Sequence, residues 1–196
     1  FQYRVAPYLR ACSDGAICSR TLRIFGMGES LVESMLRSQM NAMQNPTLAP
    51  YAKEGEVELR ITAKAGHEQE ARALITPVEA RLRAQLGSAV YGADVTSLEE
   101  VVLPLLKERG LTLGCAESCT GGLIAKRITD LPGASAVFRG SVVSYATPVK
   151  HTVLGVPQAL LEEYGAVSEP VARAMAEGAR RTLGCDLAVA VTGVAG

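Results

Sequence analysis

Apolar and polar residues follow one pattern in the first half of the chain and another in the second. In the first half, Arg20–Phe25 and Glu56–Ala63 alternate apolar and polar residues, which predicts two half-buried strands. Glu29–Met43 and His67–Leu86 repeat apolar residues at helical spacing, which predicts two amphipathic helices. The short run Ala89–Tyr91 predicts a closing strand. Together these elements predict a small α+β domain.

Prolines and glycines modify this picture at three points. The residue before a proline avoids the α region, so Asn45-Pro46 should end the first helix. Pro77 lies inside the second helix and has no N–H to donate, so we expect the helix to kink or restart there. The loop Gly26–Ser30 lacks the third glycine of a dinucleotide-binding loop, and we assign no nucleotide site to it.

In the second half, strand and helix patterns alternate. Ser97 and Glu100 have the spacing of a capping box, which predicts a helix that ends at Glu108 or Arg109, before Gly110. The elements expected next are a strand at Leu111–Cys115, a helix at Thr120–Thr129, a strand at Ser141–Tyr145, a helix at Glu169–Leu183 and a strand at Leu187–Thr192. This alternation predicts a parallel sheet covered by helices on both faces, with ligands at the carboxyl ends of its strands.

We therefore expect three parts. Residues 1–19 are the tail of a preceding domain with a linker, residues 20–95 the α+β domain, and residues 96–196 a three-layer α/β domain. The chain starts at Phe1 and stops just after an apolar run, so we expect a piece of a longer protein. An α/β domain cut before its last strands exposes a sheet edge, and the isolated chain should then self-associate or lose most of its activity.

Composition narrows the class of function. The 196 residues contain 20 Lys and Arg against 20 Asp and Glu, and each half is within one charge of neutral, which argues against nucleic-acid binding by bulk electrostatics. No apolar run approaches the ~20 residues of a membrane-spanning helix. Five cysteines form no CxxC pair and there are only two histidines, so we expect neither a disulfide framework nor a metal site. Reduced thiols in a cytoplasmic protein are the simplest interpretation.

Candidate chemistry lies where the first parallel strand ends. Ser118 lies in the tight turn between that strand and the predicted helix, whose first N–H groups favour a phosphate or an oxyanion. Gly121 and Gly122 allow a ligand to approach the backbone closely. The alternative is structural, because Ser or Thr at a helix start needs no reason beyond capping.

A nucleophilic serine needs a base. Neither His67 nor His151 lies at a strand end with an acidic partner, whereas Lys150 follows the second strand by a few residues. Burial lowers the pKa of a lysine and can make it a general base; an exposed lysine at a helix start is the structural alternative. Cys119 is a rival nucleophile, since a helix start activates thiols, or else a small buried residue.

Several segments resemble the CinA family. Those that resemble its carboxy-terminal domain are Ala116–Gly122 (AESCTGG), Leu123–Gly133 (LIAKRITDLPG), Ser144–Lys150 (SYATPVK), Gly165–Pro170 (GAVSEP) and Thr192–Gly196 (TGVAG). That domain is similar to the stand-alone nicotinamide mononucleotide deamidase. Gly26–Ser30 (GMGES) and Asn45–Val57 (NPTLAPYAKEGEV) resemble the middle domain of the same proteins, a shortened KH-like fold. Phe1–Leu9 resembles the tail of the preceding domain, which is similar to molybdopterin-binding proteins.

The resemblance implies a serine amidohydrolase with a Ser/Lys dyad that needs neither a cofactor nor a metal. Carried over by position, Ser118 is the nucleophile, Lys150 is the general base, and Tyr145 positions the dyad or contacts the substrate. The substrate-binding residues it implies are Thr120, Gly121 and Gly122 as backbone donors, and Thr192, Gly193, Ala195 and Gly196 as the lining of a nucleotide pocket. In the family, this glycine loop continues into residues that lie beyond Gly196.

The implied reaction hydrolyses nicotinamide mononucleotide to nicotinate mononucleotide and ammonia. The expected partner is therefore a pyridine mononucleotide, and we expect a homo-oligomer in the parent protein. One alternative is a non-catalytic nucleotide-binding or scaffold module, in which Ser118 caps a helix and Lys150 neutralises a phosphate; release of ammonia distinguishes the two. An RNA-binding adaptor is a third class, which the neutral charge and the lack of a basic GxxG loop oppose.

Overall fold

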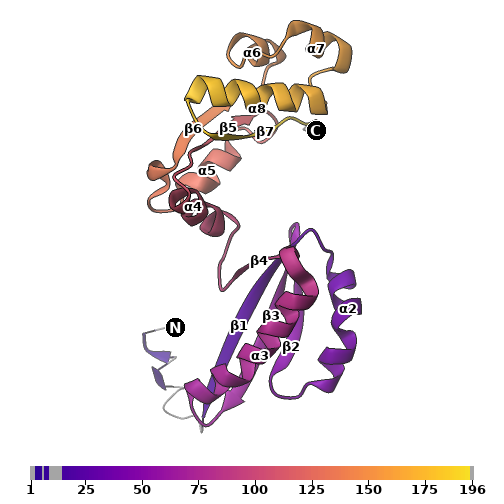
Figure 1. Ribbon diagram of the computed structural model, residues 1–196, viewed down its shortest axis with the longest axis vertical. Helices are drawn as coiled ribbons and strands as arrows, with labels where there is room; N and C mark the ends of the chain where they lie inside the picture. The colour runs from indigo at the N-terminus through magenta and orange to yellow at the C-terminus, as the bar shows by residue number, and fades with distance from the viewer. Residues whose placement is uncertain (1–2, 6, 9–14, 195–196) are drawn as a thin grey trace. The chain divides into compact units, whose positions relative to one another are not determined.

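The computed structural model describes residues 3–5, 7–8 and 15–194, and the chain forms two compact units, Phe1–Leu98 and Glu99–Gly196 (Figure 1). The first unit holds a four-stranded antiparallel sheet and the second a three-stranded parallel sheet. The predicted fold class, an α+β unit followed by a parallel-sheet α/β unit, is confirmed. Within the described part of the chain, no helix combines the length and the apolar character needed to cross a membrane.

The first unit is built around one sheet. Its elements are β1 (Ala16–Phe25), α2 (Glu29–Ala42), β2 (Thr47–Lys53), β3 (Glu56–Ala65), α3 (Glu68–Leu86), the 3-10 turn η1 (Gly87–Ala89) and β4 (Val90–Ala93). The strand order is β2-β3-β1-β4. β1 begins at Ala16 rather than at Arg20, because residues 16–19 continue its ladder with β3. β2 is not predicted by the sequence pattern; it contains Pro50, which an edge strand tolerates.

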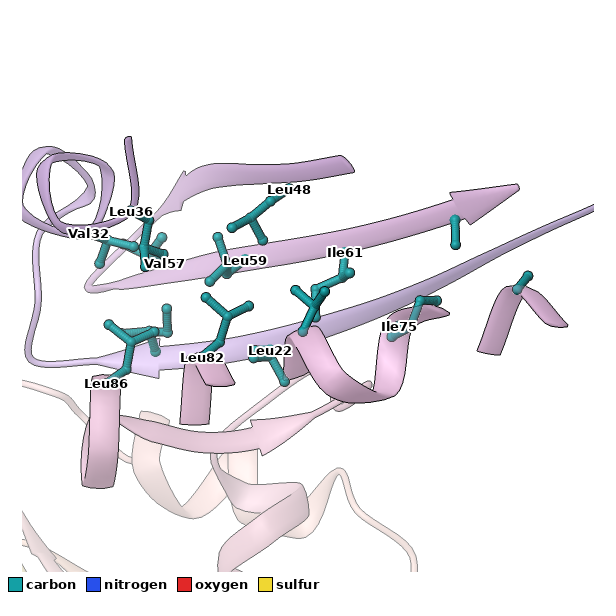
Figure 2. Close-up of a cluster of buried hydrophobic side chains, with 14 residues drawn as sticks. Leu22, Val32, Leu36, Leu48, Val57, Leu59, Ile61, Ile75, Leu82 and Leu86 are labelled. Carbon is teal, nitrogen blue, oxygen red and sulfur yellow. The ribbon is translucent and has the colours of Figure 1, made fainter. Parts of the chain in front are cut away.

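The helices α2 and α3 pack against the same face of the sheet. Figure 2 shows their apolar side chains meeting those of the strands. The cluster comprises Leu22, Ile24, Val32, Leu36, Leu48, Val57, Leu59, Ile61, Ala63, Ala71, Ile75, Val78, Leu82 and Leu86. α3 runs through Pro77 without restarting, because Ile75, Val78 and Leu82 anchor it to the sheet on both sides of the proline.

The opposite face of this sheet carries a buried arginine. Arg23 is only 6% exposed, and its guanidinium pairs with the carboxylates of both Glu56 and Glu58. The same group donates to the Tyr91 hydroxyl at 3.0 Å and to the Thr96 carbonyl oxygen at 3.1 Å. A buried cation is stable only when it is paired and hydrogen-bonded, and here all three nitrogens of the Arg23 guanidinium donate.

The second unit is built around β5. Its elements are α4 (Glu99–Glu108), β5 (Leu113–Glu117), α5 (Leu123–Thr129), the 3-10 turn η2 (Ala134–Ala136), β6 (Phe138–Val143), α6 (Thr147–Thr152), α7 (Gln158–Tyr164), α8 (Glu169–Leu183) and β7 (Leu187–Val191). The strand order is β6-β5-β7, and both pairs are parallel. β5 is buried along its whole length, as expected for the central strand of a covered parallel sheet.

Alternate residues of β5 enter cores on opposite faces of the parallel sheet. Leu113 and Cys115 pack with apolar residues of α4 and α5. Ala116 packs with Val171, Met175 and other residues of α8. Figure 1 shows α8 along one face and α5 on the other. The sheet is therefore the middle of three layers, as predicted.

Candidate active site

The parallel register brings three polar loops to one edge of the second sheet. Glu117 is paired with Val143 of β6 and with Val191 of β7, so all three strands end at the same level. The Ser144 N–H donates to the Glu117 carbonyl oxygen at 2.7 Å, which ties the loop after β6 to the end of β5. The residues directly after the strands, among them Ser118 and Thr192, are therefore neighbours in space.

Ser118 and Lys150 meet at this edge. The Lys150 Nζ lies 2.9 Å from the Ser118 Oγ, 2.6 Å from the Ser144 carbonyl oxygen and 3.5 Å from the Tyr145 carbonyl oxygen. Lys150 is 1% exposed and Ser118 is 6% exposed. Among the described residues, no carboxylate forms an ion pair with Lys150. A buried lysine whose partners are a hydroxyl and two carbonyls is the central feature of this site.

The short helix α6 holds Lys150 in place through its own C-terminal turn. The Val156 N–H donates to the Lys150 carbonyl oxygen at 3.1 Å, so the chain folds back beneath the lysine. Leu154 and Val156 are buried in the core below α8. A Cβ added to Gly178 of α8 would lie 2.1 Å from the Leu154 carbonyl oxygen, so helix and loop touch backbone to backbone.

Burial changes the acid–base behaviour of Lys150. Loss of solvent lowers the pKa of its ammonium group below the ordinary lysine value, while Cys119 acts in the opposite direction. In the neutral form, two N–H bonds can donate to the Ser144 and Tyr145 carbonyl oxygens, and the lone pair can then face the Ser118 hydroxyl. The geometry can therefore carry a proton from Ser118 to Lys150 over one hydrogen bond.

Sequence reasoning missed Glu117. This carboxylate is fully buried and accepts four hydrogen bonds, from the N–H groups of Gly122, Ile124 and Ala125 and from the Ser141 hydroxyl. Burial alone would raise the pKa of Glu117, but the backbone N–H groups and hydroxyl groups around the carboxylate together outweigh it and lower this pKa below the ordinary glutamate value. The available signal was a glutamate at the end of an otherwise apolar strand, just before a glycine turn.

The turn after Ser118 differs from the expected helix start. α5 begins at Leu123 rather than at Thr120, and Gly121 and Gly122 adopt positive φ angles of 60° and 102°. The Gly121 N–H donates to the Ser118 carbonyl oxygen and the Gly122 N–H to Glu117, so neither is a free backbone donor. The Thr120 carbonyl oxygen accepts the Leu123 N–H at 3.0 Å. The glycines therefore shape the turn that carries Ser118.

The other predicted site residues lie around this turn. The Tyr145 side chain is 66% exposed, and only its backbone carbonyl contacts Lys150. The Thr192 hydroxyl donates to the Ala166 carbonyl oxygen at 2.8 Å. A Cβ on Gly193 would lie 2.9 Å from the Cys119 Sγ, so the loop after β7 abuts the turn. Ala195 and Gly196 lie outside the described residues.

The described cysteines are free thiols. Cys18, Cys115, Cys119 and Cys185 form no disulfide. Burial raises the pKa of Cys115 to about 11, with Glu117 acting in the same direction, so this thiol is a poor nucleophile. Cys119 is half-buried next to Ser118. Within residues 3–5, 7–8 and 15–194, no group of three or more His, Cys, Asp and Glu side chains is placed to hold a metal ion.

Sequence comparison covers both units. Residues 95–196 match the family described as CinA C-terminal domain, and residues 19–92 match the family described as Damage-inducible protein CinA KH domain. The whole chain aligns at 52% identity with a Symbiobacterium thermophilum protein named for competence-damage induction, and at 48% with the CinA-like protein of Dictyoglomus turgidum. It covers 47% and 48% of these two proteins. The chain thus spans about half the length of the curated relatives it matches.

Among solved structures, the competence/damage inducible protein CihA from Agrobacterium tumefaciens is similar to part of the chain. The match has 42% sequence identity and a TM-score of 0.49, and it covers 50% of this chain and 59% of that one. The two family matches together take in both units, and the full-length alignments agree with them. The chain belongs to the CinA family.

Proposed function

We propose that the second unit is a serine amidohydrolase that converts nicotinamide mononucleotide and water to nicotinate mononucleotide and ammonia. Ser118 is the nucleophile and Lys150 is the general base. The observation that carries the proposal is the 2.9 Å contact between the Lys150 Nζ and the Ser118 Oγ, with the lysine buried and not ion-paired to any described residue. A lysine that merely neutralised a substrate phosphate would keep its charge in contact with solvent or ligand, whereas burial disfavours that charge.

The reaction proceeds through an acyl-enzyme. Neutral Lys150 takes the Ser118 proton as the Oγ attacks the amide carbon, and the proton then passes to the departing ammonia. Water attacks the resulting ester with Lys150 again as the base, which releases the carboxylate and restores the serine. The oxyanion needs backbone donors. Since Gly121 and Gly122 already donate within the turn, Cys119 and Thr120 are the residues whose N–H groups serve this purpose.

The remaining assignments follow the family resemblance. Residues 96–196 form the amidohydrolase domain and residues 20–95 its KH-like companion, in a cytoplasmic homo-oligomer that uses no metal or cofactor. Tyr145 contacts the substrate, since its side chain is exposed next to the dyad and is free to pack on a pyridine ring. The loop that contains Thr192 and Gly193 lines the nucleotide pocket, in contact with the turn at Cys119.

Ammonia release tests this function. It is measured with nicotinamide mononucleotide, for the 196-residue chain and for an extended chain that continues past Gly196 with the matching segment of the Dictyoglomus turgidum relative. The extension is included because the family's glycine loop continues there. Labelling of Ser118 by a small alkyl fluorophosphonate, followed by peptide mass spectrometry, reports an activated serine whatever the substrate is.

Three outcomes are informative. Ammonia release that disappears in Ser118→Ala supports the proposal, with the exposed Ser135→Ala as the control. Labelling without ammonia release in either chain retains the nucleophile and refutes the substrate. Absence of both labelling and ammonia release in both chains refutes the Ser/Lys mechanism.

A further inference from the structure

The Glu117 side chain forms hydrogen bonds with the end of the turn after β5, with the start of α5 and with β6. Its Oε2 accepts the N–H groups of Gly122 and Ile124, both at 3.0 Å. Its Oε1 accepts the Ala125 N–H and the Ser141 hydroxyl, also at 3.0 Å. The carboxylate is completely buried, and these four donors use all of its acceptor directions.

We propose that Glu117 is a positioning residue for Ser118, an inference that rests on the proposed function. Glu117 precedes Ser118 in the chain, and its side chain binds Gly122 at the other end of the same turn. Both ends of the Ser118–Gly122 turn are therefore fixed to one residue. The hydrogen bond from the Gly121 N–H to the Ser118 carbonyl oxygen closes the turn internally at 3.0 Å. Such a clamp restricts the direction of the Ser118 side chain toward Lys150.

The same hydrogen bonds affect whether the start of α5 can bind an anion. A helix start attracts anions because its first N–H groups are unpaired. Here the Glu117 carboxylate already occupies that place and supplies the negative charge. A second anion, such as a nucleotide phosphate, would meet both a filled donor set and a like charge. The phosphate of a substrate therefore binds away from the start of α5, which was one of the two places that the sequence suggested for it, the other being the loop that begins at Thr192.

Glu117→Gln is the central variant for the test. Glutamine keeps the volume and one acceptor oxygen, but its NH2 group cannot accept from the backbone. With its oxygen toward Gly122 and Ile124, it leaves the Ala125 N–H unsatisfied. Two controls separate positioning from stability. Ser141→Ala removes the one donor that lies on β6 rather than on the turn or α5, and Leu106→Ala destabilises the same unit from the core on α4.

The rate of Ser118 labelling by the alkyl fluorophosphonate is measured for each variant. The variants are made in the chain, with or without the extension, whose parent protein is labelled. Each rate is measured at a urea concentration at which circular dichroism shows that the protein is folded. We expect Glu117→Gln to slow labelling about tenfold or more, since small misplacements of a nucleophile have large kinetic effects. Where ammonia is released, kcat should fall by a similar factor while KM changes less than about threefold. Ser141→Ala should slow labelling about twofold, and Leu106→Ala should label at the parental rate.

Parental labelling of Glu117→Gln, or an equal loss in Leu106→Ala, overturns the positioning role. If Glu117→Gln does not fold, the labelling rate of Ser141→Ala is compared with that of Leu106→Ala. Equal labelling rates in these two variants overturn the positioning role. If the parent protein is labelled but releases no ammonia, only the proposed substrate is refuted, because the labelling rates of the variants still test the role of Glu117. A parent that does neither overturns the mechanism and this inference together.

Discussion

The Lys150 Nζ lies 2.6 Å from the Ser144 carbonyl oxygen, closer than it lies to the Ser118 hydroxyl. Ser144 is itself fully buried, and its N–H is bound to the Glu117 carbonyl oxygen. The Lys150 nitrogen is thus held by a backbone carbonyl at the end of the parallel sheet. A carbonyl also accepts from the ammonium and the amine alike, so it holds Lys150 in both protonation states.

Replacement of Lys150 by arginine should be nearly as damaging as replacement by methionine. Arginine keeps the positive charge but does not give up its proton near neutral pH. We expect both variants to lower kcat for ammonia release by about 10²–10⁴-fold, the usual contribution of a general base. In the parent, kcat should rise with pH through the pKa of Lys150, which burial places below 10.5. An arginine variant with most of the parental kcat would assign the lysine to charge neutralisation instead.

Lys150→Met should change how stability depends on pH. Because the pKa of Lys150 is lower in the folded state than the unfolded value of 10.5, the unfolded chain binds the extra proton in the window between the two. The stability of the parent therefore rises with pH across that window and is smallest below it. We expect the stability of the methionine variant, relative to the parent, to be greatest below the folded pKa of Lys150 and to decline as the pH rises toward 10.5. Urea unfolding of both proteins at several pH values measures this difference; a constant difference would contradict it.

Two adjacent variants identify the nucleophile. Ser118→Ala should abolish turnover, since it removes the hydroxyl that Lys150 contacts, and substrate binding measured by calorimetry should remain. Cys119→Ala should lower kcat less than about threefold, because its Sγ packs against Gly193 and makes no hydrogen bond to Lys150. The reverse result, in which Cys119→Ala is inactive and Ser118→Ala is active, would identify Cys119 as the nucleophile.

Gly178→Ala should destabilise the second unit, although alanine in a helix is normally favoured over glycine by about 1 kcal/mol. The added Cβ would lie 2.1 Å from the Leu154 carbonyl oxygen and 2.9 Å from its carbonyl carbon, both of them backbone atoms. We expect a loss of about 2 kcal/mol in urea unfolding. The neighbouring exposed Glu177→Ala is the control and should stay within about 0.5 kcal/mol of the parent. Equal stability of the two variants would show that α8 and the loop at Leu154 can separate without cost.

Arg23→Met should destabilise the first unit strongly. The change leaves the Glu56 and Glu58 carboxylates, which are 19% and 16% exposed, without their shared cation. Breaking a buried pair costs about 3–5 kcal/mol, and the partial exposure of these carboxylates reduces the expected loss to about 2–3 kcal/mol. Arg37→Met, which removes an exposed ion pair to Glu33, should cost less than about 0.5 kcal/mol. Urea unfolding of both variants checks the ranking.

The sequence predicted the elements that depend on local periodicity. The helix expected at Glu169–Leu183 has those bounds in the structure, because its apolar stripe, the Pro170 start and the Gly184 end all agree. β2 was missed because Pro46 indicated only the end of the preceding helix, and the pairing with β3 is what makes this segment a strand. The short helices α6 and α7 lack a pattern of their own and are held by the core below α8.

The site was less accessible to pattern reasoning than the fold. The start of α5 was placed at Thr120 because Ser118 and Thr120 resemble capping residues, whereas the cap is the Glu117 side chain, reaching five to eight residues ahead. The burial of Lys150 depends on contacts with a segment 32 residues away, which no local rule contains. The positions of Ser118 and Lys150 after two neighbouring strands were a reason to expect them together, and the family resemblance made the pairing specific.

The position of Pro50 has a consequence for the behaviour of the first unit at high concentration. β2 and β4 are the two edges of the antiparallel sheet, and an exposed edge is a template on which other chains can stack. Pro50 removes one N–H from the β2 edge, Lys53 adds a charge near its end, and β4 offers only four residues. Growth of an aggregate from either edge is therefore disfavoured, and replacement of Pro50 by valine should make this unit more prone to form thioflavin-positive fibres.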